Sequence, residues 1–88
     1  MKAKPGFILR NVVGEHILMP TGDNMGVFQA SVVFSDVAAL VWERLQAPVT
    51  REELLSAILD EYQVEEAVAA ADLDELLAKL RRYQLIED

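Results

Sequence analysis

The sequence predicts an α+β domain in which a three-stranded antiparallel sheet is followed by three helices, a winged helix-turn-helix-like arrangement. Two observations carry this prediction. Apolar runs rich in β-branched and aromatic residues fall within residues 7–34, whereas apolar residues at helical spacing fall within residues 36–83. With 88 residues, the chain has room for one small hydrophobic core and not for two. We therefore expect residues 1–88 to form a single domain.

The first two strands are predicted over residues 7–13 and 15–20. Gly14 between them permits the positive φ of a tight hairpin turn. Polar and apolar residues do not alternate cleanly here, so the sequence leaves open which face of the sheet meets the core. Residues 1–5 form a polar lead-in that we expect to fray. The segment PTGDNMG after the second strand is rich in turn-forming residues, and its single carboxylate is too few for a calcium loop.

The third strand and the first helix follow one another almost without a loop. Residues 27–34 carry no charge and no proline and read as a strand. Ser35 offers a hydroxyl N-cap and Asp36 a carboxylate in the first turn, which favours a helix over residues 36–46. Its apolar stripe is Val37, Leu40, Val41 and Leu45, widened by Trp42. An uncharged strand left open at a sheet edge is a template for pairing with another chain, so it must be covered, paired or used.

Two further helices are predicted over residues 51–62 and 65–83. Thr50 and Glu53 have the spacing of a capping box at the start of the first of them. The two apolar stripes are Leu54, Leu55, Ile58, Leu59 and Tyr62, and then Ala69, Leu73, Leu76, Leu77 and Leu80. Leu85 and Ile86 lie beyond the last helix, and we expect them to fold back onto the core.

Composition argues against most chemical functions. The chain has no cysteine, and its one histidine, His16, is interpreted as an exposed strand residue. No serine has a histidine near it in the sequence, so we expect neither an enzyme nor a metal site. A net charge of −7 disfavours nucleic acid and anionic membranes as partners. The N-terminus lacks the apolar region of a signal peptide, and the expected location is cytoplasmic.

The few basic residues include a cluster of Lys79, Arg81 and Arg82 at the end of the last helix. These cations could simply complement the helix dipole. At about 100° per residue, Arg82 points away from Leu80, whereas Lys79 and Arg81 flank the apolar stripe on opposite sides. Either could border a groove beside the helix, but both could not border the same groove.

Four segments carry a resemblance to a known family: GFILRNVVGEHILMPTG, FSDVAALVWERL, TREELLSAILDEYQVEE and DLDELLAKLRRYQLI. In this order and spacing they cover nearly the whole chain and resemble the PqqD family, whose members are also called RiPP recognition elements. Residues 35–38 read Ser-Asp-Val-Ala where many relatives have Asn-Glu-Thr-Gly, a change that keeps the helix cap. Gln63 and Glu65 stand where aspartates are common, so the last helix has a weaker N-cap.

The resemblance implies a peptide-binding module without a cofactor. Members bind the leader segment of a ribosomally made precursor peptide and present it to a modifying enzyme, often a radical SAM maturase. The leader adds as an antiparallel strand to the third strand and packs beside the last helix, a mode that suits an uncharged edge strand. Carried over, the implied site consists of Val27, Phe28, Gln29, Ala30, Ser31, Val32, Val33, Phe34, Leu73, Leu76, Leu77 and Leu80, bordered by Lys79 or Arg81.

Two alternatives remain at this point. The order of strands and helices also fits a winged-helix nucleic-acid-binding or regulatory domain, although the acidic charge lacks the electrostatic footprint of one. The other alternative is a pure assembly domain or an enzyme. Leader binding should survive moderate salt, whereas phosphate contacts should weaken steeply.

Overall fold

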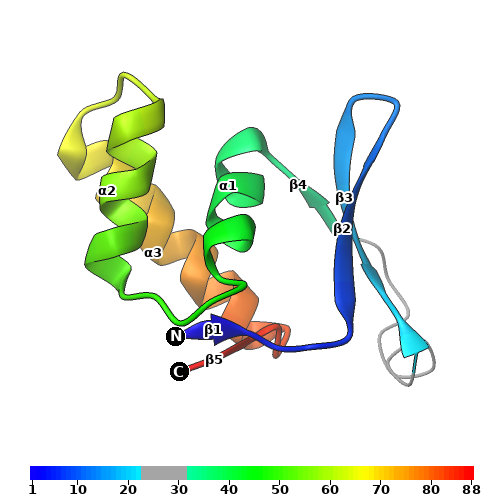
Figure 1. Cartoon of the computed structure of the whole chain (residues 1–88). Coiled ribbons are helices and arrows are strands. Elements are labelled where there is room, and N and C mark those ends of the chain that lie inside the picture. The colour runs from blue at the N-terminus through cyan, green and yellow to red at the C-terminus, as the bar shows by residue number, and fades with distance from the viewer. Residues whose placement is uncertain (23–31) are drawn as a thin grey trace. The chain divides into compact units, whose positions relative to one another are not determined.

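The computed structural model describes residues 1–22 and 32–88 of the chain. It confirms the α+β class, with a three-stranded antiparallel sheet followed by three helices (Figure 1). The chain forms two compact units, one of Pro5–Ala39 and one of Met1–Lys4 together with Leu40–Asp88. Each unit is described separately below.

The unit Pro5–Ala39 contains the three-stranded sheet. Its strands β2 (Phe7–Val12), β3 (Glu15–Pro20) and β4 (Val32–Phe34) are antiparallel and lie in the order β2-β3-β4. The first two strands match their predicted ranges to within one residue. Of the third predicted strand, residues 27–31 lie outside the described part of the chain, and β4 is its last three residues.

The hairpin between β2 and β3 turns at Val13 and Gly14, as the glycine predicted. Both residues have positive φ, 51° and 81° respectively, which is the backbone pattern of a two-residue type I′ turn. The Asn11 side chain accepts a hydrogen bond of 3.1 Å from the Gly14 amide. The turn therefore fixes the pairing of Val12 with Glu15, and with it the register of the whole hairpin.

Helix α1 (Asp36–Arg44) begins in this unit and ends in the other one. The Ser35 hydroxyl accepts a hydrogen bond from the Ala38 amide, which confirms the predicted N-cap. Its most buried residues are Ala38, Ala39, Val41 and Trp42, whereas Val37 and Leu40 are only half-buried. The buried stripe is thus rotated slightly from the predicted one toward the two alanines.

The second unit is built on α2 (Arg51–Glu61) and α3 (Glu66–Arg82). Thr50 and Glu53 form the predicted capping box, whereas the N-cap of α3, Glu65, makes no side-chain cap bond. The core gathers the inward residues of both helices, the end of α1 and the C-terminal segment: Val41, Trp42, Leu45, Leu54, Ala57, Ile58, Ala69, Leu73, Leu77, Leu80 and Leu85. Across the surface, Arg51 on α2 donates hydrogen bonds to the Asp74 carboxylate on α3, which lowers the pKa of that carboxyl.

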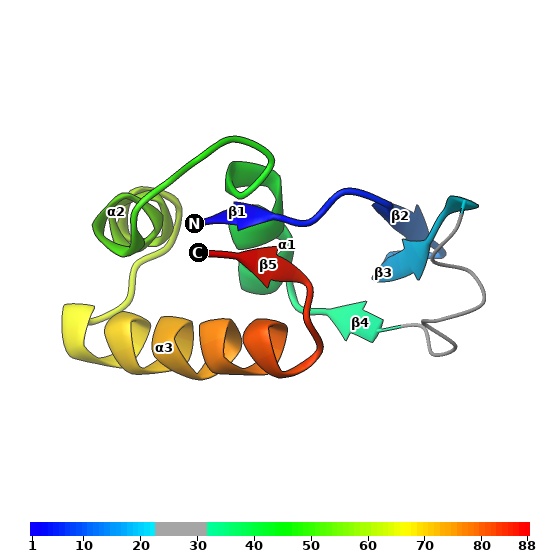
Figure 2. The ribbon, with the colours of Figure 1, turned by 90° about the horizontal axis from the view of Figure 1, so that it is seen from below.

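The chain ends pair with one another, contrary to the expectation that residues 1–5 fray. Strand β1 (Lys2–Ala3) pairs antiparallel with β5 (Ile86–Glu87), and the two lie side by side in Figure 2. The Ala3 amide also donates to the Leu45 carbonyl at 2.7 Å, and the Lys4 amide to the Leu85 carbonyl at 2.9 Å. Burial of Ala3 and Ile86 against the core outweighs the polarity of the flanking lysines. Leu85 and Ile86 are buried, as predicted.

Candidate functional site

The structure decides which face of the sheet is buried, a point that the sequence left open. Cross-strand neighbours share a face, so the register places Leu9, Leu18 and Val32 in one row and His16 beside Phe34 in the next. Leu18 and Phe34 are buried and Leu9 and Val32 are half-buried. This inner face is the packed one.

The opposite, outer face of the sheet is largely apolar and yet exposed, with two charged members, Arg10 and Glu15. It carries Ile8, Arg10, Val12, Glu15, Ile17, Met19 and Val33, of which only Ile17 is half-buried. Val33 on β4 is 59% exposed, although the solvated face of an antiparallel sheet usually carries polar side chains. We call this set the outer face below.

Both outer strands of the sheet, β2 and β4, have an edge with no neighbouring strand in the described part of the chain. One backbone hydrogen bond at the open end of the β2–β3 hairpin shows to which neighbouring strand each residue directs its backbone N–H and C=O groups. In an antiparallel pair, residues alternate between those that exchange backbone hydrogen bonds with their partner and those that do not. The Thr21 amide donates to the Gly6 carbonyl at 2.8 Å. Counting along the register from that bond, Ile17 directs its N–H and C=O groups to β2, and its neighbours His16 and Leu18 direct theirs to β4.

The same count fixes the edge of β4. Val32 and Phe34 are the residues opposite Leu18 and His16, so they use their backbone groups to bond with β3. Val33, opposite Ile17, directs its N–H and C=O away from β3. Within the described part of β4, Val33 is therefore the residue that offers a donor and an acceptor to an added strand.

His16 anchors the start of α1 to the sheet next to this edge. Its Nε2 lies 2.8 Å from Asp36 Oδ1, in the first turn of the helix that follows β4 directly. The imidazole is 26% exposed, so His16 is half-buried and paired and not the exposed residue that the sequence suggested. The contact holds β3 and the residue two positions beyond β4 together.

The predicted residues of α3 divide into a buried and an exposed set. Leu73, Leu77 and Leu80 are buried in the core of their own unit, and Leu76 is half-buried. Arg81 donates to the Asp88 carboxylate at 3.0 Å, and these bonds lower the pKa of that carboxyl. Lys79 is exposed and forms no ion pair with any residue that the structure describes.

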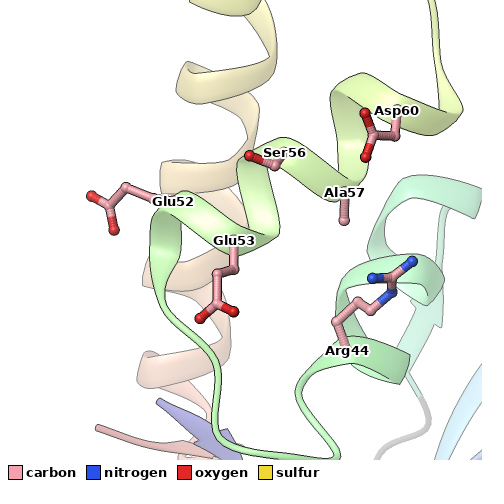
Figure 3. Close-up of a pocket in the computed structure, with 6 residues that line it drawn as sticks. All are labelled: Arg44, Glu52, Glu53, Ser56, Ala57 and Asp60. Atoms are coloured by element: carbon pink, nitrogen blue, oxygen red, sulfur yellow. The ribbon is translucent and has the colours of Figure 1, made fainter.

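A shallow hollow of about 360 Å³ lies elsewhere, between the end of α1 and the outer side of α2. It is lined by Arg44, Glu52, Glu53, Ser56, Ala57 and Asp60, none of which the sequence analysis selected. Figure 3 shows Glu52 and Asp60 at opposite ends of the lined stretch, so the carboxylates do not converge on one point. Among the described residues, no cluster of acidic or histidine side chains could hold a metal ion, and no helix is long and apolar enough to span a membrane.

Comparison with known proteins agrees with the resemblance seen in the sequence. The family model described as coenzyme PQQ synthesis protein D (PqqD) matches residues 15–86, well over half of the chain. No curated protein sequence matches. Among solved structures, "TbiB1 in Complex with the TbiA(beta) Leader Peptide" is similar with a TM-score of 0.76 and 23% identity, covering 99% of this chain and 95% of that one. "Lasso peptide synthetase B1 complexed with the leader peptide" has a TM-score of 0.74 and 18% identity, covering 99% and 96%.

Proposed function

The chain belongs to the PqqD family, and from this premise we propose that it binds the leader segment of a ribosomally made precursor peptide. The leader pairs as an additional strand with the open edge of β4, and the protein presents it to a modifying enzyme. The observation that carries the proposal is the edge at Val33, whose backbone N–H and C=O groups point away from the sheet. Two structures with the same fold were solved with leader peptides bound, which supports the same class of ligand here.

Backbone pairing explains how such a module can recognise a peptide without catalytic groups. Each hydrogen bond to the edge gives affinity that does not depend on the peptide sequence, and side-chain contacts then select the register. The inner side of β4 is closed by the buried Phe34, whereas its outer side is open at Val33. The short length of β4 in the described part of the chain limits the number of these bonds.

The rest of the implied site belongs to the same proposal. Residues Val27, Phe28, Gln29, Ala30 and Ser31, which the sequence assigns to the same strand, extend the proposed edge. On α3, the side chains proposed to take part are Leu73, Leu76, Leu77 and Leu80, with Lys79 or Arg81 at the border. The partner proposed to receive the leader is a radical SAM maturase, and the module itself needs no cofactor.

The test is calorimetric titration with synthetic peptides that correspond to the N-terminal halves of short open reading frames beside the gene. We expect one of them to bind the parent protein and to bind the Val33→Pro variant about ten- to a hundredfold more weakly. Proline removes the edge donor of β4 while leaving the bonds of Val32 and Phe34 to β3 in place. Circular dichroism checks that the variant stays folded.

Asn11→Pro supplies the matched control, because it removes a donor from the other edge of the same sheet. The register directs the backbone groups of Asn11 away from β3, as it does those of Val33. We expect this variant to bind the peptide like the parent, and circular dichroism checks that loss of the Asn11 side chain, which accepts from the Gly14 amide, leaves the hairpin folded. Loss of binding in Asn11→Pro with full binding in Val33→Pro would assign the peptide to the edge of β2 and overturn the proposal, as would the failure of every peptide to bind.

A further inference from the structure

The outer face of the sheet is an apolar surface that the fold of this unit does not explain. Four of its members, Ile8, Val12, Met19 and Val33, are among the most exposed large apolar side chains of the described chain. Val33 is the most exposed of the four at 59%, and it lies in one cross-strand row with Ile17 and Arg10. Exposed apolar side chains that gather on one face are typical of surfaces that contact a partner.

A second copy of this chain is a poor occupant of the outer face. The described strands β2 and β3 have six residues each and β4 has three. At about 3.4 Å per residue and about 4.8 Å between strands they present roughly 250 Å² per copy, or about 500 Å² for a pair, whereas a stable interface buries about 1,200 Å² or more. Each copy also carries a net charge of −7, so two copies repel one another. A strand added to the open edge of β4 extends the sheet and places its outward side chain beside Val33, the most exposed member of the face.

We propose that the leader strand carries an apolar side chain that packs on Val33 at the outer face. The cross-strand row of Arg10, Ile17 and Val33, called the outer row below, then helps to determine which leader sequences bind. This inference rests on the proposed function and deepens it by naming the chemistry of one leader position. Each strand of the sheet contributes one residue to the outer row, in the order Arg10, Ile17 and Val33. A strand added to β4 would contribute a fourth residue beside Val33.

The leader residue opposite Val33 is the one whose side chain contacts the edge of β4 most directly. Val33 would exchange both backbone bonds with the leader residue opposite it, and residues opposite one another place their side chains on the same face. That leader side chain therefore lies over the outer row, flanked by leader residues that point to the inner side. A β-branched or aromatic residue there covers the exposed part of Val33, whereas a carboxylate would be placed on an apolar surface.

The experiment uses the peptide that binds the parent protein in the titration above, as a series in which each residue in turn is replaced by Glu. Every peptide is titrated into the parent, into Val33→Lys and into Val68→Lys. Val68 is the matched control because it is a valine of similar exposure, 51%, on α3. We expect the unmodified peptide to bind Val33→Lys about three- to tenfold more weakly than the parent and Val68→Lys equally well.

The Glu series then identifies the partner position. At one position Glu should weaken binding to the parent about tenfold, and Val33→Lys should recover most of that loss because Lys and Glu then lie directly opposite one another. Glu at other positions should show no such recovery. The recovery is a gain of affinity, which a merely unfolded variant cannot produce.

The titrations distinguish a failure of the proposed function from a failure of this inference. If no peptide binds the parent, the proposed function itself is wrong. If a peptide binds and is weakened by Val33→Pro, but Val33→Lys binds it like Val68→Lys and no Glu position is recovered, the proposed function stands and this inference is overturned. Concentration-dependent self-association of the parent in sedimentation, abolished in Val33→Lys, would assign the outer face to a second copy and also overturn it.

Discussion

At the residue scale, Val13 has a backbone conformation that β-branched side chains rarely adopt. Its φ is 51° and its side chain is 98% exposed, so neither packing nor burial offsets the strain. Asn tolerates this region, and Asn-Gly is the preferred pair for a two-residue hairpin turn. We expect Val13→Asn to stabilise the protein by about 0.5–1 kcal/mol.

Thermal melts of Val13→Asn check this expectation. Val12→Asn serves as the control, because Val12 belongs to β2 and lacks the positive φ. A Tm for Val13→Asn at or below that of the parent would mean that Val13 does not have the strained conformation.

Trp42 is the largest side chain in the core of its unit and is only 3% exposed. Removing an aromatic side chain from a packed core costs the transfer free energy and leaves a cavity, so we expect Trp42→Ala to lower the free energy of unfolding by about 3–5 kcal/mol. The total free energy of unfolding of a domain of this size is little larger than that. Urea denaturation measures the loss, and a shift under 1 kcal/mol would contradict the observed burial.

Single residues show where sequence reasoning was sufficient. The caps at Ser35 and Thr50 were predictable because a cap depends on residues only three positions apart. The role of His16 was not, because its partner Asp36 lies twenty residues away and is brought near only by the pairing of β3 with β4. The importance of Val33 likewise depends on the pairing of β4 with β3, which places Val33 opposite Ile17 and which no local sequence pattern determines.

At the scale of elements, α3 ends in cations that differ in their surroundings. Arg81 is engaged by Asp88, whereas Lys79 forms no ion pair with the described residues. We therefore expect Lys79→Glu to weaken leader binding about three- to tenfold and Arg81→Glu to change it little. Titrations at two salt concentrations test this, and the difference between the variants should shrink as salt rises.

The opposite order, with Arg81→Glu costly and Lys79→Glu neutral, would assign the border of the site to Arg81. If neither Lys79→Glu nor Arg81→Glu changes leader binding, neither cation belongs to the proposed site. Arg82→Glu is the internal control, because the sequence places Arg82 on the side of α3 opposite Leu80.

The elements themselves were largely predictable because each has its own periodicity and boundary signals. The two-residue strands β1 and β5 were not, because no local pattern identifies a strand of that length. They form only when the ends of the chain meet over buried Ala3 and Ile86. The inner and outer faces of β2 were also beyond the sequence, since apolar residues occupy both faces.

At the scale of the whole molecule, the single domain expected from the chain length remains a prediction. Helix α1 starts in one compact unit and ends in the other, so melting of either unit removes part of that helix. We expect one cooperative unfolding transition with an enthalpy of about 60 kcal/mol and equal calorimetric and van't Hoff values. Two separate heat-capacity peaks would show that the units unfold independently.

The most direct test of leader pairing at β4 is residue-resolved amide hydrogen exchange, measured by NMR with and without saturating peptide. In the free protein the amides of Val32 and Phe34 should already exchange slowly, because they bond to β3, whereas the amide of Val33 should exchange fast. On binding, we expect exchange at Val33 to slow by about tenfold or more while its two neighbours change little. Unchanged exchange at Val33 under saturating peptide would contradict the account.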